Sequence, residues 1–183
     1  MRKIVPFKLR KLIKKWMDKL GSSYFNLSAI DDTLPDDLFI AGYPKSGNTW
    51  LQNIVVELLY DVDSSKISDP LLQELVPDVH FKRYYKRFIG GMPFKTHFLP
   101  HPKYRRVLYI VRDGRDVMTS YYHYLTALGH GYNSIGDLIK KGDNLFPSSW
   151  DKHVRDWVDN PYKADMLIVR YEDLLNSPKE TIV

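Results

Sequence analysis

The sequence predicts an α/β fold, a single domain in which helices flank a central, mostly parallel sheet. Short apolar runs typical of buried strands alternate with longer segments whose apolar residues recur at helical spacing. The 183 residues, 44% of them apolar, suffice for one domain with its own core. A Gly-containing loop joins the first such strand to the first such helix. In parallel sheets a loop in this position binds phosphate groups.

The first strand and the first helix surround that loop. Residues 38–42 form a short apolar run, and residues 49–60 have the periodicity of a helix. The side of this helix predicted to be buried consists of Leu51, Ile54, Val55, Leu58 and Leu59. Residues 61–85 are rich in Asp, Ser and Pro, which predicts an irregular surface segment with short helical pieces.

Strands and helices continue to alternate after this segment. We predict strands at residues 93–98, 106–111 and 166–170, and helices at residues 113–128 and 148–160. Ser148 and Asp151, three residues apart, predict a capping box at the start of the last helix. Because helices separate the strands, we expect a parallel sheet covered on both faces.

Composition excludes several classes of site. The chain has no cysteine, so it has no disulfide, thiolate metal site or cysteine nucleophile, which fits a reducing, cytoplasmic setting. Its apolar runs are too short to cross a bilayer. His97 and His101 are four residues apart, but Pro100 and Pro102 prevent the helix that this spacing would need for a metal site. We therefore expect no metal.

The positive charge is concentrated in the first twenty residues. This arm holds eight Lys or Arg residues against one acid, a net charge of +7, whereas the whole chain carries +5. The remaining residues are thus slightly acidic, so we expect no nucleic-acid partner. The apolar residues of the arm at helical spacing are Leu9, Leu12, Ile13, Trp16, Met17 and Leu20. Such a helix either lies on an anionic membrane as a peripheral contact or packs on its own domain, and the pattern does not separate these alternatives.

The loop itself departs from the usual nucleotide P-loop. That loop places lysine directly after its second glycine, but here Asn48 follows Gly47 and Lys45 precedes it by two residues. The string Tyr43-Pro44-Lys45-Ser46-Gly47-Asn48-Thr49-Trp50 closely resembles the 5′-phosphosulfate-binding loop of the sulfotransferases that use 3′-phosphoadenosine 5′-phosphosulfate (PAPS).

Further matches to this family follow in order along the chain. Residues 105–125 resemble its 3′-phosphate site, with Arg112 at a strand end and Ser120 in the next helix. Residues 94–98 resemble its catalytic strand, and Lys95 and His97, two apart, point to one face of a strand. Residues 148–157 resemble a helix that is mainly structural in the family. Tyr171 matches a tyrosine that approaches the adenine.

The resemblance implies a PAPS-dependent sulfotransferase that moves a sulfonate in line to an acceptor hydroxyl or amine, releases 3′-phosphoadenosine 5′-phosphate (PAP) and uses no metal. It implies that His97 is the general base, that Lys45 offsets charge on the leaving oxygen and that Lys95 steadies the sulfonate. The residues that it assigns to the co-substrate are Lys45, Ser46, Gly47, Asn48, Thr49, Trp50, Arg112, Ser120 and Tyr171.

Two other functions remain open. A P-loop nucleotide kinase would need a lysine after Gly47 and a magnesium-binding aspartate at a strand end, where this sequence has Arg112. A weak or inactive PAPS/PAP-binding fragment is the second alternative, because the family's domain continues past the point at which this chain ends. We therefore expect residues 1–20 to form the arm, and residues 21–183 to form a sulfotransferase-like domain without its C-terminal part. The acceptor is expected to be a small molecule, and no residue fixes its identity or the oligomeric state.

Overall fold

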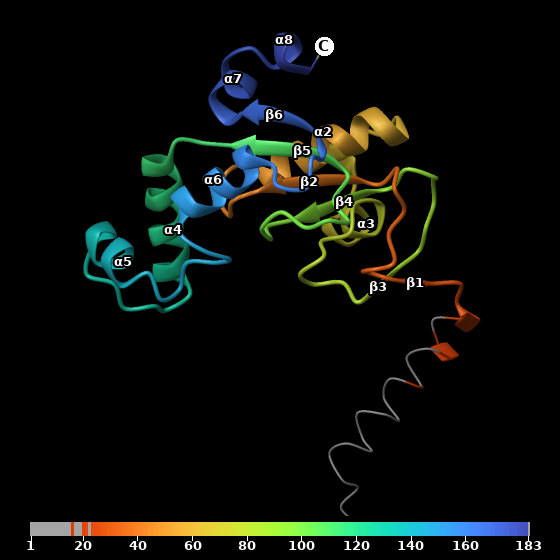
Figure 1. Ribbon diagram of the computed structural model, residues 1–183, viewed down its shortest axis with the longest axis horizontal. Helices are drawn as coiled ribbons and strands as arrows, with labels where there is room; N and C mark the ends of the chain where they lie inside the picture. The colour runs from red at the N-terminus through yellow and green to blue at the C-terminus, as the bar shows by residue number, and fades with distance from the viewer. Residues whose placement is uncertain (1–15, 17–19, 22, 183) are drawn as a thin grey trace, which may run out of the picture.

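The computed structural model describes residue 16, residues 20 and 21, and residues 23–182. Its central sheet has four parallel strands in the spatial order β4-β2-β5-β6 (Figure 1). These strands are β2 (Leu38–Gly42), β4 (Pro93–Thr96), β5 (Arg106–Val111) and β6 (Asp165–Arg170). A separate antiparallel pair is formed by β1 (Ser28–Ala29) and β3 (Tyr84–Tyr85). The predicted α/β fold with a parallel sheet is confirmed.

Helices follow the strands along the chain. They are α2 (Asn48–Tyr60), α3 (Asp69–Leu75), α4 (Gly114–Ala127), α5 (Ile135–Lys141), α6 (Trp150–Asp159), α7 (Tyr171–Asn176) and α8 (Pro178–Ile182), with a short 3₁₀ helix, η1, at Ser64–Lys66. The three helices expected from periodicity are present as α2, α4 and α6, and the four expected strands are present as β2, β4, β5 and β6. Their bounds differ from the prediction by no more than two residues. The helices α5 and α7 were not predicted.

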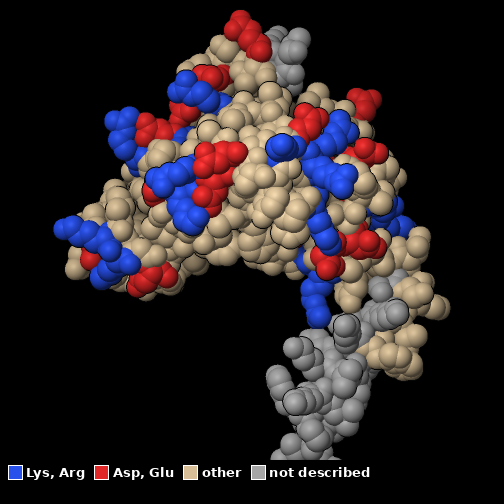
Figure 2. Space-filling view, in the orientation of Figure 1, with Lys and Arg blue, Asp and Glu red and all other residues tan. Residues whose placement is uncertain are grey.

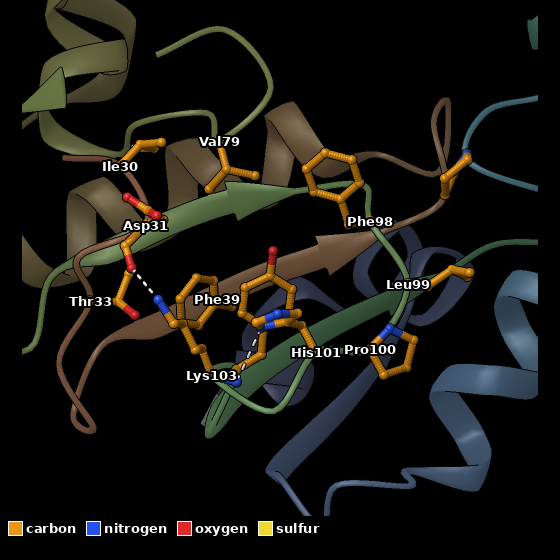
Figure 3. A pocket seen from close by; sticks show the side chains of 12 residues that line it. Ile30, Asp31, Thr33, Phe39, Val79, Phe98, Leu99, Pro100, His101 and Lys103 are labelled. Atoms are coloured by element: carbon orange, nitrogen blue, oxygen red, sulfur yellow. Dashed lines mark hydrogen bonds between the residues drawn. The ribbon is translucent and has the colours of Figure 1, made fainter. Parts of the chain in front are cut away.

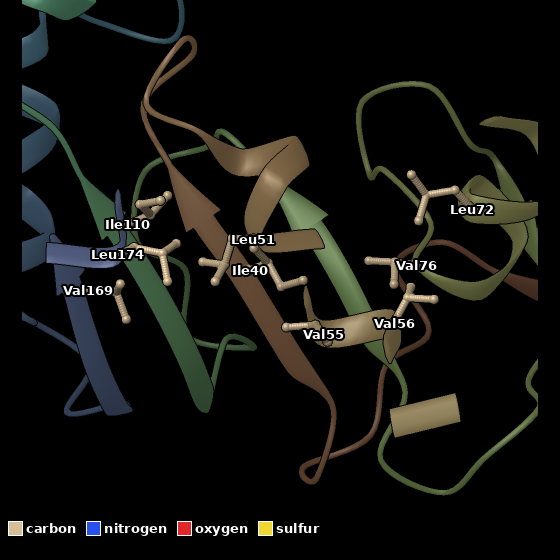
Figure 4. Packing of buried hydrophobic residues seen from close by; sticks show 9 residues of the cluster. All are labelled: Ile40, Leu51, Val55, Val56, Leu72, Val76, Ile110, Val169 and Leu174. Atoms are coloured by element: carbon tan, nitrogen blue, oxygen red, sulfur yellow. The ribbon is translucent and has the colours of Figure 1, made fainter. Parts of the chain in front are cut away.

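The two faces of the sheet carry separate apolar clusters because successive side chains of a strand point to opposite faces. On β2, Ile40 packs with residues of α2, α3 and α7, as Figure 4 shows. Phe39 and Ala41 point to the other face, where Trp157 of α6 joins the cluster. Both faces of the sheet are therefore covered, which is why its middle strands are almost wholly apolar.

The buried side of α2 differs from the prediction at its last turn. Leu51 and Val55 are buried, as expected, but Leu58 and Leu59 are 65% and 45% exposed. These two leucines border an open apolar hollow of about 300 Å³ beside β5 and β6. Gln52 is buried instead because its amide donates to the carbonyl of Val76 at 2.9 Å. Helical spacing alone does not show where a neighbouring element stops covering a helix.

The predicted capping box of α6 is wrong. Ser149, not Ser148, is the N-cap residue, and its side chain makes no capping hydrogen bond. The hydroxyl of Ser148 donates instead to the carbonyl of Ser149 at 3.0 Å. The helix therefore begins one residue later than the box would require.

The strand β6 lies at one end of the sheet. It is bonded to β5 along its inner side, and no strand within the described part of the chain pairs with its outer side. Leu167 and Ile168 of β6 are exposed.

The surface seen in Figure 2 carries Lys and Arg side chains interspersed with Asp and Glu. Of the N-terminal arm, the structure describes only Trp16 and Leu20, and both side chains are exposed. The predictions for the rest of the arm lie outside the described residues. No helix among the described residues is long and apolar enough to span a membrane.

Candidate functional site

A cavity of about 940 Å³ lies where the parallel strands end. The chain enters this region after each of the four strands, because the carboxyl ends of parallel strands meet at one edge. All the predicted site residues except Ser46 line the cavity, namely Lys45, Gly47, Asn48, Thr49, Trp50, Lys95, His97, Arg112, Ser120 and Tyr171. Segments that are far apart in the sequence thus converge on one site.

The loop between β2 and α2 presents polar atoms without internal partners. The hydroxyl of Ser46 and the Oδ1 atom of Asn48 are buried and make no hydrogen bond within the described protein. Asn48 also donates from Nδ2 to the carbonyl of Tyr43 at 2.9 Å, which holds the loop in shape. The N-cap residue Gly47 provides no side chain to the free N–H groups of α2. A hydroxyl donor beside a helix N-terminus fits a phosphate or sulfonate group.

Gly47 is required at its position for two reasons. Its φ angle of 101° lies in the left-handed region, where a side chain is strained. A Cβ atom there would also lie 2.7 Å from the ring of Tyr171. The glycine therefore allows the loop and the segment after β6 to approach each other.

Arg112 stands at the end of β5 beside this loop. Its Nη1 atom donates to the carbonyl of Lys45 at 3.3 Å, and its guanidinium carbon lies 4.3 Å from the centre of the Tyr171 ring. The nearest contact with Asp116 is 3.8 Å, too long for a hydrogen bond, and the Nε atom is buried with no hydrogen-bond partner among the described residues. Arg112 therefore keeps donors that can serve an anion, while Tyr171 holds its plane.

Tyr171 lies between Arg112 and the helix α2 and contacts both. Its ring also packs edge to face against Trp50, with 5.6 Å between the ring centres. Arg112, Tyr171 and Trp50 therefore form one row along a wall of the cavity. Ser120 reaches the same cavity from α4, as does Tyr124.

The two lysines of the cavity have different surroundings. Lys45, with a φ of 71°, places its ammonium group 4.8 Å from the centre of the Tyr124 ring. Lys95 is buried, and its Nζ atom lies 3.4 Å from Oδ2 of Asp78, which is fully buried. Lys95 therefore has a fixed counter-ion, whereas the ammonium group of Lys45 rests on an aromatic face.

His97 is held as a neutral ring with a defined tautomer. Its Nδ1 atom lies 2.8 Å from the carbonyl oxygen of Gly42. Since a carbonyl only accepts, Nδ1 carries the proton and Nε2 carries the lone pair. Burial lowers the pKa of His97 to about 4; the hydrogen bond to Gly42 opposes this shift, and the charge of Lys95 adds to it. The ring is thus unprotonated at Nε2 near pH 7 and can accept a proton there.

Sequence reasoning missed several residues of this site. Asp78 and His80 also line the cavity, but they lie in the segment predicted to be irregular surface. Their positions at the cavity come from pairing with β4, since Lys95 donates its N–H to the carbonyl of Pro77 and Val79 donates to the carbonyl of Lys95. The short Pro-Asp-Val-His run was the only local signal, and it does not reveal which strand it joins.

A second cavity of about 590 Å³ lies on the other side of the segment that carries His97 (Figure 3). Its walls include Phe39, Val79, Phe98 and Tyr104, and Lys103 donates at its edge to the carbonyl of Asp31 at 2.7 Å. None of the predicted site residues lines it. Three neighbouring pairs contribute one residue to each cavity: residues 79 and 80, 97 and 98, and 146 and 147.

Comparison with protein families identifies one match. A family model described as "Sulfotransferase domain" matches residues 35–183. Among curated proteins, sulfotransferase 1B1 of Mus musculus is 30% identical over 170 residues, covering 81% of this chain and 56% of the relative. Sulfotransferase 1E1 of Homo sapiens is 28% identical over 170 residues, covering 81% of this chain and 57% of the relative. The chain thus spans little more than half the length of these relatives.

Solved structures share the fold. Retinol dehydratase in complex with androsterone and PAP has a TM-score of 0.58 at 21% identity, covering 82% of this chain and 58% of that protein. A mouse sulfotransferase complexed with PAP has a TM-score of 0.58 at 21% identity, covering 82% of this chain and 57% of that protein.

Proposed function

Because the chain belongs to the sulfotransferase domain family, we propose that it binds PAPS and transfers the sulfonate to a small-molecule acceptor with a hydroxyl or amine group, releasing PAP. The observation that carries this proposal is a set of buried polar atoms around Gly47 that have no hydrogen-bond partner within the described part of the chain, contributed by Ser46, Asn48 and Arg112. Two structures of the same fold are complexes with PAP, which supports this choice of nucleotide.

The loop and the arginine would hold the co-substrate at its two anionic ends. When bound, PAPS supplies an activated sulfonate as a mixed anhydride with the 5′-phosphate. Residues 45–50 are suited to the 5′ end, because hydroxyl, amide and helix N–H donors meet there. Arg112 and Ser120 are suited to the 3′-phosphate, with Tyr171 and Trp50 providing aromatic surface beside them.

The chemistry would be divided among three side chains. Lys45 stabilises negative charge on the leaving oxygen, an electrostatic role that needs a mobile ammonium group near the loop. Lys95 fixes sulfonate oxygens from a position set by Asp78. His97 takes the proton from the acceptor at Nε2, since its Nδ1 proton is engaged by Gly42. In-line transfer then depends mainly on positioning and charge, as in phosphoryl transfer.

Calorimetric titration tests the choice of nucleotide. We expect PAP to bind more tightly than ATP, with no change on adding Mg²⁺. Arg112→Ala should weaken PAP binding by about 10- to 100-fold, because charged hydrogen bonds are lost. Arg115→Ala is the matched control, since this exposed arginine pairs with Asp113 and does not line the cavity. Tighter, Mg²⁺-dependent binding of ATP would instead favour the nucleotide kinase.

A transfer assay separates the enzyme from a binding fragment. Chromatography of PAP formed from PAPS in the presence of a phenol, a primary alcohol or an amine measures turnover directly. Tight PAP binding with no PAP formed from PAPS with any acceptor would show that the chain binds the nucleotide without turnover.

A further inference from the structure

The backbone after β4 is held almost entirely by side chains. The N–H of His97 donates to Nε2 of His80 at 2.8 Å, and the carbonyl of His97 accepts from Nε2 of His153 at 3.2 Å. For Phe98, the N–H donates to the hydroxyl of Thr96 at 3.1 Å, and the carbonyl accepts from the indole of Trp157 at 3.2 Å. Regular pairing ends at Thr96, so these bonds fix the position of His97.

The ring of His80 continues the hydrogen bonding of the segment that runs beside β4. Residues 77–79 run beside β4, with Lys95 donating to the carbonyl of Pro77 at 2.9 Å and Val79 donating to the carbonyl of Lys95 at 3.0 Å. The next N–H along β4 is that of His97, and the ring of His80 accepts it. A ring nitrogen that accepts from N–H carries no proton, so Nε2 of His80 is unprotonated.

His153 holds the carbonyl of His97 from the opposite side, on α6. It is fully buried, and its Nε2 atom must donate because a carbonyl only accepts. Its Nδ1 atom lies 3.1 Å from the hydroxyl of Tyr109, which donates to it when the ring is neutral. Trp157, one helical turn later, holds the carbonyl of Phe98. The helix α6 thus contacts the segment through two side chains on one face.

We propose that His80 and His153 are positioning residues that hold His97 with its proton on Nδ1 and its lone pair on Nε2. Neither residue needs to touch the acceptor, because both bind the backbone of His97. The hydrogen bond from Nδ1 of His97 to Gly42 forms only when the backbone of His97 is in this position. If that backbone becomes mobile, the ring can rotate, or its proton can move from Nδ1 to Nε2. The inference rests on the proposed function, since a base is needed only for sulfonate transfer.

The charges around the three rings are consistent with this arrangement. Burial lowers the pKa of both His97 and His153 to about 4 and also lowers the pKa of His80. Asp78 and Lys95 face His80 and His97 with opposing effects, and Asp156 and His97 face His153. All three rings are therefore neutral near pH 7, and for His80 the hydrogen bond that its Nε2 accepts requires this.

The first test reads the tautomer without any reaction. Long-range ¹H–¹⁵N spectra of the imidazole rings distinguish protonated from unprotonated nitrogens, and the His97 signals are those missing in His97→Asn. We expect one form with Nδ1 protonated in the unaltered protein. In His80→Ala and His153→Ala we expect a mixture of tautomers, or titration of His97 at higher pH. His80→Gln and His153→Gln place an amide oxygen or an N–H near the lost ring atom and should restore the single form.

The second test measures turnover. In the alanine variants we expect kcat to fall about 10- to 100-fold, because part of the rate acceleration that a general base provides is lost. The Kd for PAP should be unchanged. The pH at which kcat is half-maximal should rise toward the ordinary pKa of histidine. The glutamine variants should recover most of kcat. His130→Ala, at an exposed histidine between α4 and α5, serves as the control.

Two results overturn the positioning role. One is protonation of Nε2 in His97 of the unaltered protein; the other is an unchanged single tautomer in alanine variants that remain folded by circular dichroism. Absence of sulfonate transfer by the unaltered chain would overturn the proposed function instead, and the tautomer spectra would still decide the positioning role.

Discussion

Lys45 and Lys95 line the same cavity but differ in how far their side chains are buried. Lys45 is partly exposed and its ammonium group lies over the aromatic face of Tyr124, so this group can move toward a developing charge. Lys95 is 9% exposed and faces a carboxylate that is fully buried. The first lysine is therefore a candidate for chemistry alone, and the second combines a site role with the stability of the fold.

Replacing Lys45 tests the first role. Lys45→Met keeps the length of the side chain but removes its charge, so kcat for sulfonate transfer should fall by about two to three orders of magnitude. The free energy of unfolding, measured in urea, should change little. Lys140→Met, on the exposed surface of α5, should leave both unchanged. Full activity of Lys45→Met would exclude the leaving-group role.

Replacing Lys95 should cost stability as well as activity. Lys95→Met leaves Asp78 charged and buried without its partner, which typically lowers the free energy of unfolding by about 3–5 kcal/mol. The double variant Asp78→Asn, Lys95→Met removes both charges and should recover most of that loss in urea unfolding, while turnover stays low. If the double variant is no more stable than Lys95→Met, the ion pair is not the cause.

At the scale of elements, the strand–loop–helix at residues 38–60 could be predicted closely because its signals are local. The apolar run gives β2, and the Gly-containing loop marks the helix start within one residue. The exposure of Leu58 and Leu59 could not be predicted, since it depends on what lies over the last turn of α2. The short helices α5 and α7 were missed because six or seven residues hold too few turns to show a period.

Replacing Gly47 tests whether the close contact between the loop and Tyr171 is needed for stability and for binding. Gly47→Ala should destabilise the protein by about 1–3 kcal/mol and weaken PAP binding, because it combines a strained φ with a steric clash. Gly129→Ala is the matched control: its φ of 87° is also positive, but, apart from its neighbours in the chain, none of the described residues has an atom within 4 Å of an added Cβ. Urea unfolding and calorimetry measure both effects. Equal losses in the two variants would mean that the φ angle alone matters.

At the scale of the whole molecule, the site joins residues from all four strand ends. The resemblance to a family predicted which residues meet there, whereas spacing alone predicted only that Lys95 and His97 share a face. Asp78, His80 and His153 could not be predicted, because their contacts with β4 and with His97 after it join segments that are separated by many residues. Local sequence patterns carry no information on such pairings.

His97 and His153, whose pKa values are lowered to about 4, make the stability of the whole fold depend on pH. Above pH 6.5 they are neutral in both the folded and the unfolded chain, so they have no effect. Between pH 6.5 and about 4 the unfolded chain binds protons that His97 and His153 do not, and stability falls as pH falls. The loss is on the order of 3 kcal/mol for each ring. Below pH 4 both states are protonated and this contribution is constant.

Urea unfolding at pH 7, 6, 5 and 4.5 measures this dependence. The free energy of unfolding should change less steeply with pH in His153→Gln, because this variant removes one of the two rings whose pKa is lowered to about 4. His130→Gln changes an exposed histidine and should keep the original slope. An unchanged slope in His153→Gln would mean that other groups, such as carboxylates, produce the pH dependence.

The outer side of β6 determines how the protein behaves when it is concentrated. Within the described residues no strand pairs with this outer side, so its N–H and C=O groups, next to the exposed Leu167 and Ile168, form a template to which a strand of another copy can add. Because this addition is bimolecular, we expect aggregation to increase with protein concentration and with storage time. Ile168→Lys places like charges on adjoining copies and opposes the addition, so it provides a soluble form for spectroscopy that needs concentrated samples.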